Sequence, residues 1–295
     1  MSILYIHCRK GLYQLTTCKT CGYCFECQNC SAKLTTYRKN GTNLDMLCHQ
    51  CQTNYKYPDI CPKCKSKDII SKFGGIEDLA EYLENYYQEP VFFVDKGKIG
   101  NINVHTRLFD PSLDYSQFSK IILWQSQNLL ASTDYMVTEE ITKNLCEIMI
   151  QIQGTNTELV FDQNTENLEI SQKATKMTVM DFYENMLTNE SKIRKVLKFP
   201  PFYNFLLLTS HEKTSSKAIA ILESVRDYLK SIDFEELTIA NPYPAKFLKR
   251  KNLFSYHLLL KYPKQYSNYE KLQKLLFKLQ SQHGFQIRLN PKNLF

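Results

Sequence analysis

Residues 18–64 read CKTCGYCFECQNCSAKLTTYRKNGTNLDMLCHQCQTNYKYPDICPKC and hold nine of the chain's eleven cysteines, eight of them in Cys-x-x-Cys pairs. Each of four Cys-x-x-Cys knuckles presents two thiolates about one tetrahedral edge apart, and four knuckles supply the eight sulfurs that two all-cysteine zinc sites require. The spacing therefore predicts a module folded around two structural Zn²⁺ ions. The knuckles are Cys18/Cys21, Cys27/Cys30, Cys48/Cys51 and Cys61/Cys64.

The competing interpretation of these cysteines is a disulfide scaffold, and the choice depends on the compartment. The apolar stretch after Met1 is far too short for the core of a signal peptide. No later run approaches the roughly 18 apolar residues of a membrane span. We therefore expect a cytoplasmic chain, where thiols stay reduced and this spacing favours metal. Four thiolates leave no open position on the ion, so both sites are expected to be structural rather than catalytic.

The residues between Cys30 and Cys48 indicate which knuckles share an ion. They contain Asn40-Gly41 between β-forming residues, which predicts a hairpin. Because a hairpin returns its two ends to one place, we expect one zinc on Cys27, Cys30, Cys48 and Cys51, and the other on Cys18, Cys21, Cys61 and Cys64. The rival grouping places the first four cysteines on one ion and the last four on the other. It would bring two knuckles together over only the five residues 22–26.

Three cysteines and one histidine remain outside this scheme. Cys8, Cys24 and Cys146 are each expected to be small buried hydrophobic residues rather than ligands or nucleophiles. His49 lies between two predicted ligands and is expected to have no metal role.

Positive charge is concentrated near the C-terminus. From residue 199 onward there are fifteen Lys or Arg against seven Asp or Glu, a net charge of +8, whereas the whole chain carries +7. The preceding part is therefore close to neutral. This asymmetry suggests an anionic partner for the C-terminal part, with nucleic acid as the first candidate.

After the cysteine-rich segment, helical and extended patterns alternate. Apolar residues at helical spacing over 76–87 precede a buried strand at 90–95. Further strands are expected at 101–106, 120–125 and 158–161, with a helix over 141–152. A helix leading into a strand is typical of an α/β layer, which the zinc module would interrupt near its start.

A helix over 177–197 ends at Pro200-Pro201, which marks a domain boundary. Beyond it the pattern predicts the order βαββαβ, which is that of the ferredoxin-like, or split-βαβ, sandwich. The expected strands are 203–209, 237–241, 255–261 and 285–289, and the expected helices are 215–231 and 268–282.

The loop expected between the two middle strands mixes cations with aromatic rings. Phosphate-pairing cations beside stackable rings are typical of a single-strand nucleic-acid surface. The alternative is a solvated basic loop whose rings turn inward, and the residue pattern leaves both open. The candidate contacts are Lys246, Lys249, Arg250, Lys251, Phe247 and Tyr243.

The four knuckles in this spacing, together with motifs on either side of them, resemble the PriA family of replication-restart helicases along essentially the whole chain. The resemblance implies the same interleaved cysteine pairs on two zinc ions. It also implies a second helicase lobe, interrupted by the zinc module, and a C-terminal domain that contacts DNA. The flanking motifs are Cys8-Arg-Lys-Gly11, Gly75-Ile-Glu-Asp-Leu79, Leu197-Lys-Phe-Pro-Pro-Phe202, Asn241-Pro-Tyr-Pro-Ala-Lys246 and Leu289-Asn-Pro291.

The chain departs from the family where nucleotide would bind. The first ATPase lobe, with its phosphate loop and acidic box, has no counterpart in the sequence. The family's Gln-x-x-Gly-Arg-x-Gly-Arg motif aligns with Gln151-Ile-Gln-Gly154-Thr-Asn-Thr-Glu158, in which both arginines are missing. Its Gly-Thr-Gln-Met stretch aligns with His105-Thr-Arg-Leu. Such arginines contribute about 10³ to 10⁵ in rate in comparable NTPases, so the chain alone is expected to lack ATPase activity.

The expected organisation is a degenerate second helicase lobe (1–17 and 65–170), a zinc module (18–64), a connecting helix (171–198) and a ferredoxin-like C-terminal domain (199–295). The expected function is that of a PriA-like primosomal protein that binds forked or single-stranded DNA, with primosome proteins and single-stranded DNA-binding protein as partners by resemblance. Three alternatives remain open. The first is a helicase subunit completed by a separate N-terminal half, the second is a zinc-ribbon protein that binds RNA or the ribosome, and the third is a purely structural product of evolutionary decay.

Overall fold

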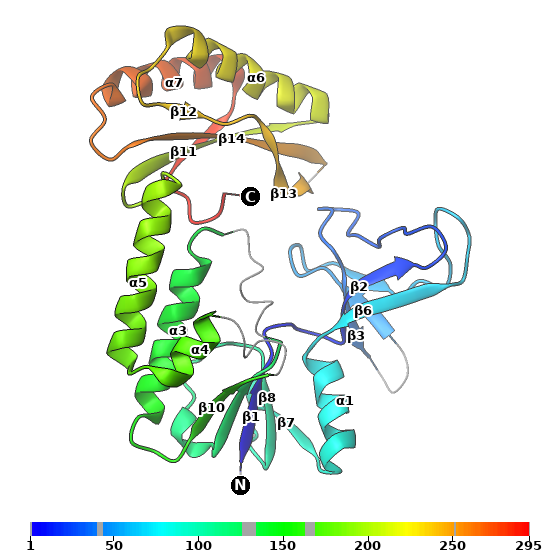
Figure 1. Cartoon of the computed structure of the whole chain (residues 1–295). Coiled ribbons are helices and arrows are strands. Elements are labelled where there is room, and N and C mark those ends of the chain that lie inside the picture. Colours follow the sequence, from blue (N-terminus) through cyan, green and yellow to red (C-terminus); the bar gives the residue numbers. More distant parts are fainter. Residues whose placement is uncertain (1, 40–43, 126–133, 163–168, 251, 295) are drawn as a thin grey trace. The chain divides into compact units, whose positions relative to one another are not determined.

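A computed structural model describes residues 2–39, 44–125, 134–162, 169–250 and 252–294 (Figure 1). Contacts divide the chain into two compact units, one built mainly from residues before Thr188 and the other mainly from Thr188–Phe295. Within the described ranges, no helix is both long enough and apolar enough to cross a membrane.

A five-stranded parallel sheet forms the centre of the first unit, in the order β10-β9-β1-β8-β7. Such a sheet must be covered on both faces, and its strands are correspondingly rich in buried apolar residues. The strands are β1 (Ile3–Ile6), β7 (Val91–Phe93), β8 (Ile102–His105), β9 (Lys120–Leu123) and β10 (Glu158–Phe161).

Helices supply this cover, because successive side chains of a strand point to opposite faces. Tyr5 joins the core of one face with residues of α1 (Ile76–Tyr87). Leu4 and Ile6 join the core of the other face with residues of α3 (Val137–Ile152). That second core also takes side chains from α4 (Glu169–Lys176) and α5 (Val179–Val196).

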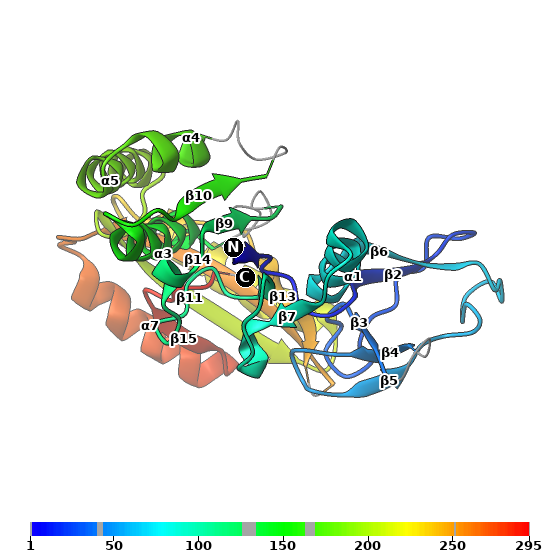
Figure 2. The same ribbon diagram turned by 90° about the horizontal axis from the view of Figure 1, so that it is seen from below.

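An antiparallel sheet in the order β5-β4-β3-β2-β6 carries the cysteine knuckles (Figure 2). Strand β2 (Tyr13–Cys18) enters the module, and β6 (Ile69–Gly74) leaves it directly alongside, from Tyr13 opposite Gly74 to Cys18 opposite Ile69. The module therefore begins and ends at one place in the α/β layer. The other strands are β3 (Thr35–Arg38), β4 (Leu44–Leu47) and β5 (Asn54–Lys56).

The hairpin predicted between the second and third knuckles is present as the pair β3 and β4, with Thr35 opposite Leu47. Its predicted turn at Asn40-Gly41 lies outside the described residues. The prediction of a mixed α/β chain is confirmed, since parallel and antiparallel sheets occur together.

The second unit contains an antiparallel sheet in the order β12-β14-β11-β15. Its central strands β11 (Tyr203–Glu212) and β14 (Leu253–Pro263) pair over ten positions. One face carries Leu206, Leu208, Leu258 and Leu260, which form a core with α6 (Ser215–Ile232) and α7 (Tyr269–His283). Strands β12 (Thr238–Ile239) and β15 (Gln286–Leu289) are short.

The structure corrects the expected loop between the two middle strands of this unit. Much of that segment is a further strand, β13 (Tyr243–Arg250), which pairs with β14 through an irregular register between Pro244 and Lys249. Pro244 lies in this strand and is tolerated because β13 is an added edge strand with a bulge, where a missing N–H does not interrupt a ladder.

Candidate metal centres

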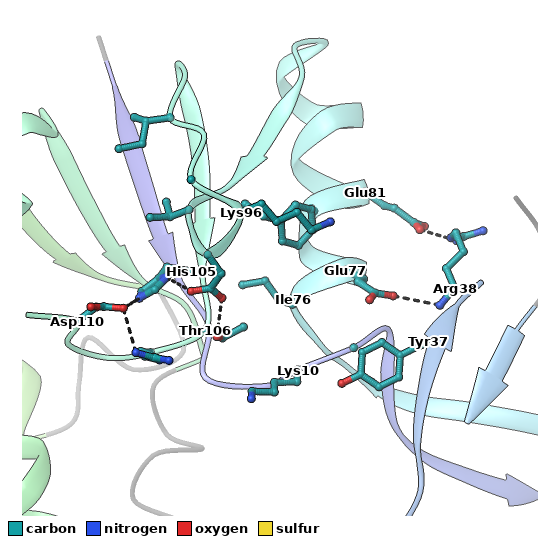
Figure 3. Close-up of a pocket in the computed structure, with 18 of the residues that line it drawn as sticks. Lys10, Tyr37, Arg38, Ile76, Glu77, Glu81, Lys96, His105, Thr106 and Asp110 are labelled. Atoms are coloured by element: carbon teal, nitrogen blue, oxygen red, sulfur yellow. Dashed lines mark hydrogen bonds and ion pairs between the residues drawn. The ribbon is translucent and has the colours of Figure 1, made fainter. Parts of the chain in front are cut away.

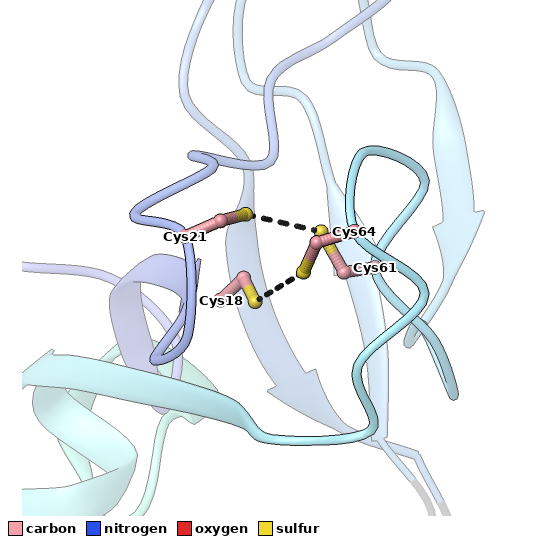
Figure 4. A group of neighbouring side chains, drawn as sticks. All are labelled: Cys18, Cys21, Cys61 and Cys64. Atoms are coloured by element: carbon pink, nitrogen blue, oxygen red, sulfur yellow. Dashed lines mark hydrogen bonds between the residues drawn. The ribbon is translucent and has the colours of Figure 1, made fainter.

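The first group of four cysteines lies where β2 and β6 run side by side. Cys18 ends β2, and the knuckle Cys61/Cys64 comes shortly before β6 begins. Figure 4 shows the four sulfurs facing one another, with Cys18 Sγ 3.6 Å from Cys64 Sγ and Cys21 Sγ 3.6 Å from Cys61 Sγ. All four sulfurs lie within 4.8 Å of one another.

The second group consists of Cys27, Cys30, Cys48 and Cys51, whose sulfurs also lie within 4.8 Å of one another. Cys48 directly follows β4, so the β3–β4 hairpin returns it toward the preceding knuckle. The sulfurs of Cys27 and Cys51 are 3.4 Å apart. The structure thus places the eight knuckle cysteines in the two groups expected from the hairpin and does not assemble the rival grouping.

These sulfur separations fit a tetrahedral ion and do not fit disulfides. A disulfide requires about 2.05 Å between sulfurs, well below the 3.4–3.6 Å found here. Zinc–sulfur bonds of about 2.3 Å place tetrahedral sulfurs about 3.8 Å apart. Both tetrads are therefore compatible with structural zinc, and four thiolates suit this ion chemically.

All four knuckles share one backbone conformation. In each of them the N–H of the first cysteine donates to the carbonyl five residues later, at 2.7–2.9 Å. The residue after the second cysteine always has a positive φ, between 58° and 71°. Only one of these four positions is a glycine, so three side chains accept a conformation that normally favours glycine. The four positions are Gly22, Ser31, Gln52 and Lys65.

Hydroxyl groups lie against the sulfurs of the second tetrad. The Thr53 hydroxyl is 3.1 Å from Cys51 Sγ, and the Tyr55 hydroxyl is 3.2 Å from Cys27 Sγ. The hydrogen bond from Thr53 is the main cause that lowers the pKa of Cys51, to about 6. A thiol with a lowered pKa is largely a thiolate at neutral pH, which is the form that binds metal.

The remaining cysteines lie outside the tetrads. Cys146 lies on α3 and is buried in the core, as expected, and Cys24 is half-buried. The expectation for Cys8 is wrong, because this residue is exposed just after β1 ends. His49 Nε2 lies 2.8 Å from the Tyr37 hydroxyl rather than in a tetrad.

The predicted nucleic-acid residues lie along β13. Lys246 is exposed, and Lys249 Nζ lies 5.7 Å from the centre of the Phe254 ring. Tyr243 is half-buried against His257, and its hydroxyl donates to the Leu294 carbonyl. Its ring therefore turns inward, as the alternative interpretation allowed.

Three of the predicted contacts remain, and they are Phe247, Arg250 and Lys251. Phe247 is half-buried on the same strand. The side chain of Arg250 and the whole of Lys251 lie outside the described residues.

A cavity of about 1100 Å³ in the first unit was not predicted from the sequence. Figure 3 shows its two walls, one with Glu81 turned toward Arg38 and the other with His105 beside Asp110. His105 is 1% exposed, and its Nδ1 lies 2.9 Å from Asp95 Oδ1. Burial is the main cause that lowers the pKa of His105.

Two carboxylates flank this histidine. Its Nε2 lies 3.8 Å from Asp110 Oδ2, and its Nδ1 faces Asp95. One ligand atom from each of Asp95, His105 and Asp110 lies within 4.8 Å of the other two, so these three residues form a further group of possible metal ligands. Asp110 also accepts hydrogen bonds from Ser112 and from Arg107. The only sequence signal for this place was the departure of residues 105–108 from the family's motif.

Comparison with known proteins identifies relatives along most of the chain. Residues 195–292 match the family model described as the primosomal protein N C-terminal domain. Replication restart protein PriA of Thermotoga maritima is 25% identical over 284 residues, which are 88% of this chain and 36% of the relative. The PriA of Borreliella burgdorferi is 25% identical over 92% of this chain and 42% of the relative. That of Bacillus subtilis is 21% identical over 93% of this chain.

These relatives confirm the family resemblance and also limit it. The chain spans between a third and a half of the length of the relatives described above. The matched part covers about nine-tenths of this chain, and the family model lies within its second unit.

Proposed function

We propose, on the premise that this chain belongs to the PriA family of replication restart proteins, that it acts in replication restart as a primosomal DNA-binding protein. The carrying observation is that the similarity runs along about nine-tenths of a chain that holds two complete cysteine tetrads. The ligand is forked or single-stranded DNA, and the protein partners are primosome proteins and single-stranded DNA-binding protein.

The two tetrads hold one structural zinc ion each in this proposal. Cys18, Cys21, Cys61 and Cys64 are the ligands of the first ion, and Cys27, Cys30, Cys48 and Cys51 those of the second. The ions hold together a small antiparallel sheet that buries few large apolar side chains, and four thiolates leave no position for substrate. The zinc module therefore presents a surface to DNA or to a partner and performs no chemistry.

The arrangement of strands supports the proposed domains. The parallel order β10-β9-β1-β8-β7 suits a degenerate second helicase lobe at 1–17 and 65–170, interrupted by the zinc module at 18–64. Helix α5 forms most of the proposed connection at 171–198. In the C-terminal domain at 199–295, the order β12-β14-β11-β15, with α6 and α7 on one face, supports the ferredoxin-like arrangement.

Binding without ATP hydrolysis is part of the proposal. Gln151, which remains from the family's arginine-containing motif, accepts a hydrogen bond from the Tyr115 N–H at 3.0 Å. Arg107, in the other altered motif, donates to Asp110 at 3.1 Å. Both side chains therefore have partners within the lobe, which supports a structural role for what is left of these motifs.

The proposed DNA contacts of the C-terminal domain are the cations of β13, above all Lys246 and Lys249. Lys246 is exposed, and the domain carries the excess positive charge of the chain. Cations that neutralise phosphates contribute affinity that falls with salt.

Fluorescence anisotropy with forked DNA, single-stranded DNA and structured RNA, all at one stated salt concentration, tests the function. Tighter binding of fork or single-stranded DNA than of RNA is expected, whereas equal affinity would favour the RNA-binding alternative. Lys246→Gln with Lys249→Gln should weaken DNA binding and lower the salt slope by roughly 1.4. The matched control changes Lys274 and Lys278, two exposed lysines on α7, to Gln.

An ATPase assay with the same DNA separates the helicase-subunit alternative. No DNA-stimulated hydrolysis is expected from this chain. Substantial turnover by the chain alone would overturn the proposal and favour a helicase activity.

A further inference from the structure

One face of the sheet in the second unit carries polar and cationic side chains. The register pairs Leu207 with Leu259 and with Arg288, and Thr209 with His257. Directly opposed residues of antiparallel strands lie on the same face. Leu207 and Leu259 belong to a small core separate from the one that covers α6 and α7. Arg288 and His257 therefore lie on the face turned away from the two helices.

Hydrogen bonds orient both histidines of this face. His257 Nδ1 lies 2.9 Å from the Thr209 hydroxyl, and His211 Nδ1 lies 2.8 Å from the Ser255 hydroxyl. Each imidazole thus uses Nδ1 within the sheet, which leaves Nε2 as the nitrogen that can meet a ligand. His257 is 4% exposed, whereas His211 lies at the exposed end of the row.

Positive charge on this face has no acidic counterpart among the described residues. Arg288 is exposed, and no carboxylate of the described residues lies within ion-pair distance of it. Arg226 on α6, by contrast, pairs with Asp227 at 2.8 Å. Burial, together with the charges of Arg288 and His211, lowers the pKa of His257 to about 4.

We propose that the histidine–arginine face, made of His211, Ser255, His257 and Arg288, binds backbone phosphates of a single-stranded nucleic acid. This inference rests on the proposed function and assigns part of its DNA contact to a sheet face rather than to β13 alone. The guanidinium of Arg288 matches two phosphate oxygens. The buried Ser255 hydroxyl donates to His211 Nδ1, which leaves the proton of that ring on Nε2 as a further donor. Tyr243 of β13 lies opposite His257, so the face continues directly into the strand of Lys246.

The inference can be tested with two exposed substitutions, Arg288→Gln and His211→Gln, in the full chain. Binding of a single-stranded oligonucleotide is followed by anisotropy at several salt concentrations. Arg288→Gln should weaken binding about 3- to 10-fold and lower the salt slope by roughly 0.7, since one phosphate contact is lost. His211→Gln should weaken binding to a smaller extent. Lys274→Gln, on α7, is the control and should leave affinity nearly unchanged.

A second measurement follows the imidazole resonances of His211 and His257 by NMR during addition of the oligonucleotide or of inorganic phosphate. Shifts of both rings with the oligonucleotide support the inference. Shifts with inorganic phosphate but none with the oligonucleotide would overturn the inference, because the face would then be a site for free anions.

The outcomes also distinguish this inference from the proposed function. If the wild type binds the oligonucleotide and both variants match Lys274→Gln, the inference fails and the proposed function stands. If the wild type binds no oligonucleotide, the proposed function fails and takes the inference with it.

Discussion

The sulfur of Cys18 lies 3.6 Å from the sulfur of Cys64, although 46 positions separate the two cysteines in the sequence. Pairing of β2 with β6 brings them together, with Cys18 opposite Ile69. The same arrangement places the two remaining knuckles at the ends of the β3–β4 hairpin. The chain therefore has two separate candidate metal sites, and a substitution can remove one of them without the other.

We therefore predict two zinc ions per chain, measured by elemental analysis of the purified protein. Cys18→Ser should lose the ion of the first tetrad, and Cys48→Ser that of the second, so each variant should retain one ion. Cys24→Ser is the matched control and should keep both, since Cys24 lies in neither tetrad. A wild type with one zinc would contradict the assignment of ligands.

Removal of the metal should unfold the cysteine-bearing sheet locally. Addition of a strong chelator is expected to speed amide hydrogen exchange in β2 and β6, because their ends are held together by the first tetrad. Amides of β11 and β14 should stay protected, since their core with α6 and α7 contains no cysteine. Unchanged protection of β2 and β6 after complete zinc release would show that the sheet is stable without metal.

The left-handed positions of the knuckles give a prediction about the backbone. Gly22 has φ 71° and open space where a Cβ would be placed, so Gly22→Ala should cost about 1 kcal/mol of stability from the backbone alone. Lys65→Gly, at the equivalent position of the same tetrad, should change stability by less than about 0.5 kcal/mol. Relief of strain there offsets the greater freedom of the unfolded chain.

Thermal unfolding of the zinc-loaded protein measures both changes. Equal losses for Gly22→Ala and Lys65→Gly would mean that φ at these positions does not control the stability of the tetrad.

His257 predicts a pH dependence in the second unit. Burial is the main cause that lowers its pKa to about 4, against 6.5 for an ordinary histidine. As the pH falls below 6.5, the unfolded chain takes up a proton that the folded domain refuses. Stability is therefore lost between about pH 6.5 and pH 4, by up to about 3 kcal/mol. The variant His257→Gln should lose less stability than the wild type between pH 6.5 and pH 4.

Urea unfolding at pH 7 and near pH 4, followed through methyl resonances of Leu207 and Leu259, provides the test. Zinc loss in acid affects wild type and variant alike. The difference between the two proteins in the free energy of unfolding lost from pH 7 to pH 4 therefore isolates the contribution of His257. Identical losses of unfolding free energy in wild type and variant would show that this ring does not stay neutral in the folded domain.

Local patterns predicted much of the module and of its candidate metal sites. The spacing of Cys48 and Cys51 identified a knuckle, and Asn40-Gly41 indicated the hairpin whose strands are present. The same approach failed for Cys8, which is exposed, and for β13, which was expected to be a loop. Exposure and edge pairing depend on neighbours that are distant in the sequence, which no local pattern contains.

The sequence by itself determined the eight candidate ligands, the resemblance to the PriA family and the basic character of the C-terminal part, because spacing and charge are properties of neighbouring residues. Only the tertiary structure decided that Tyr243 turns inward, that His105 lies between Asp95 and Asp110, and that Arg288 shares a sheet face with His257. Those relationships arise from the register and packing of strands far apart in the chain. Register is selected by burial of the whole sheet rather than by any one segment.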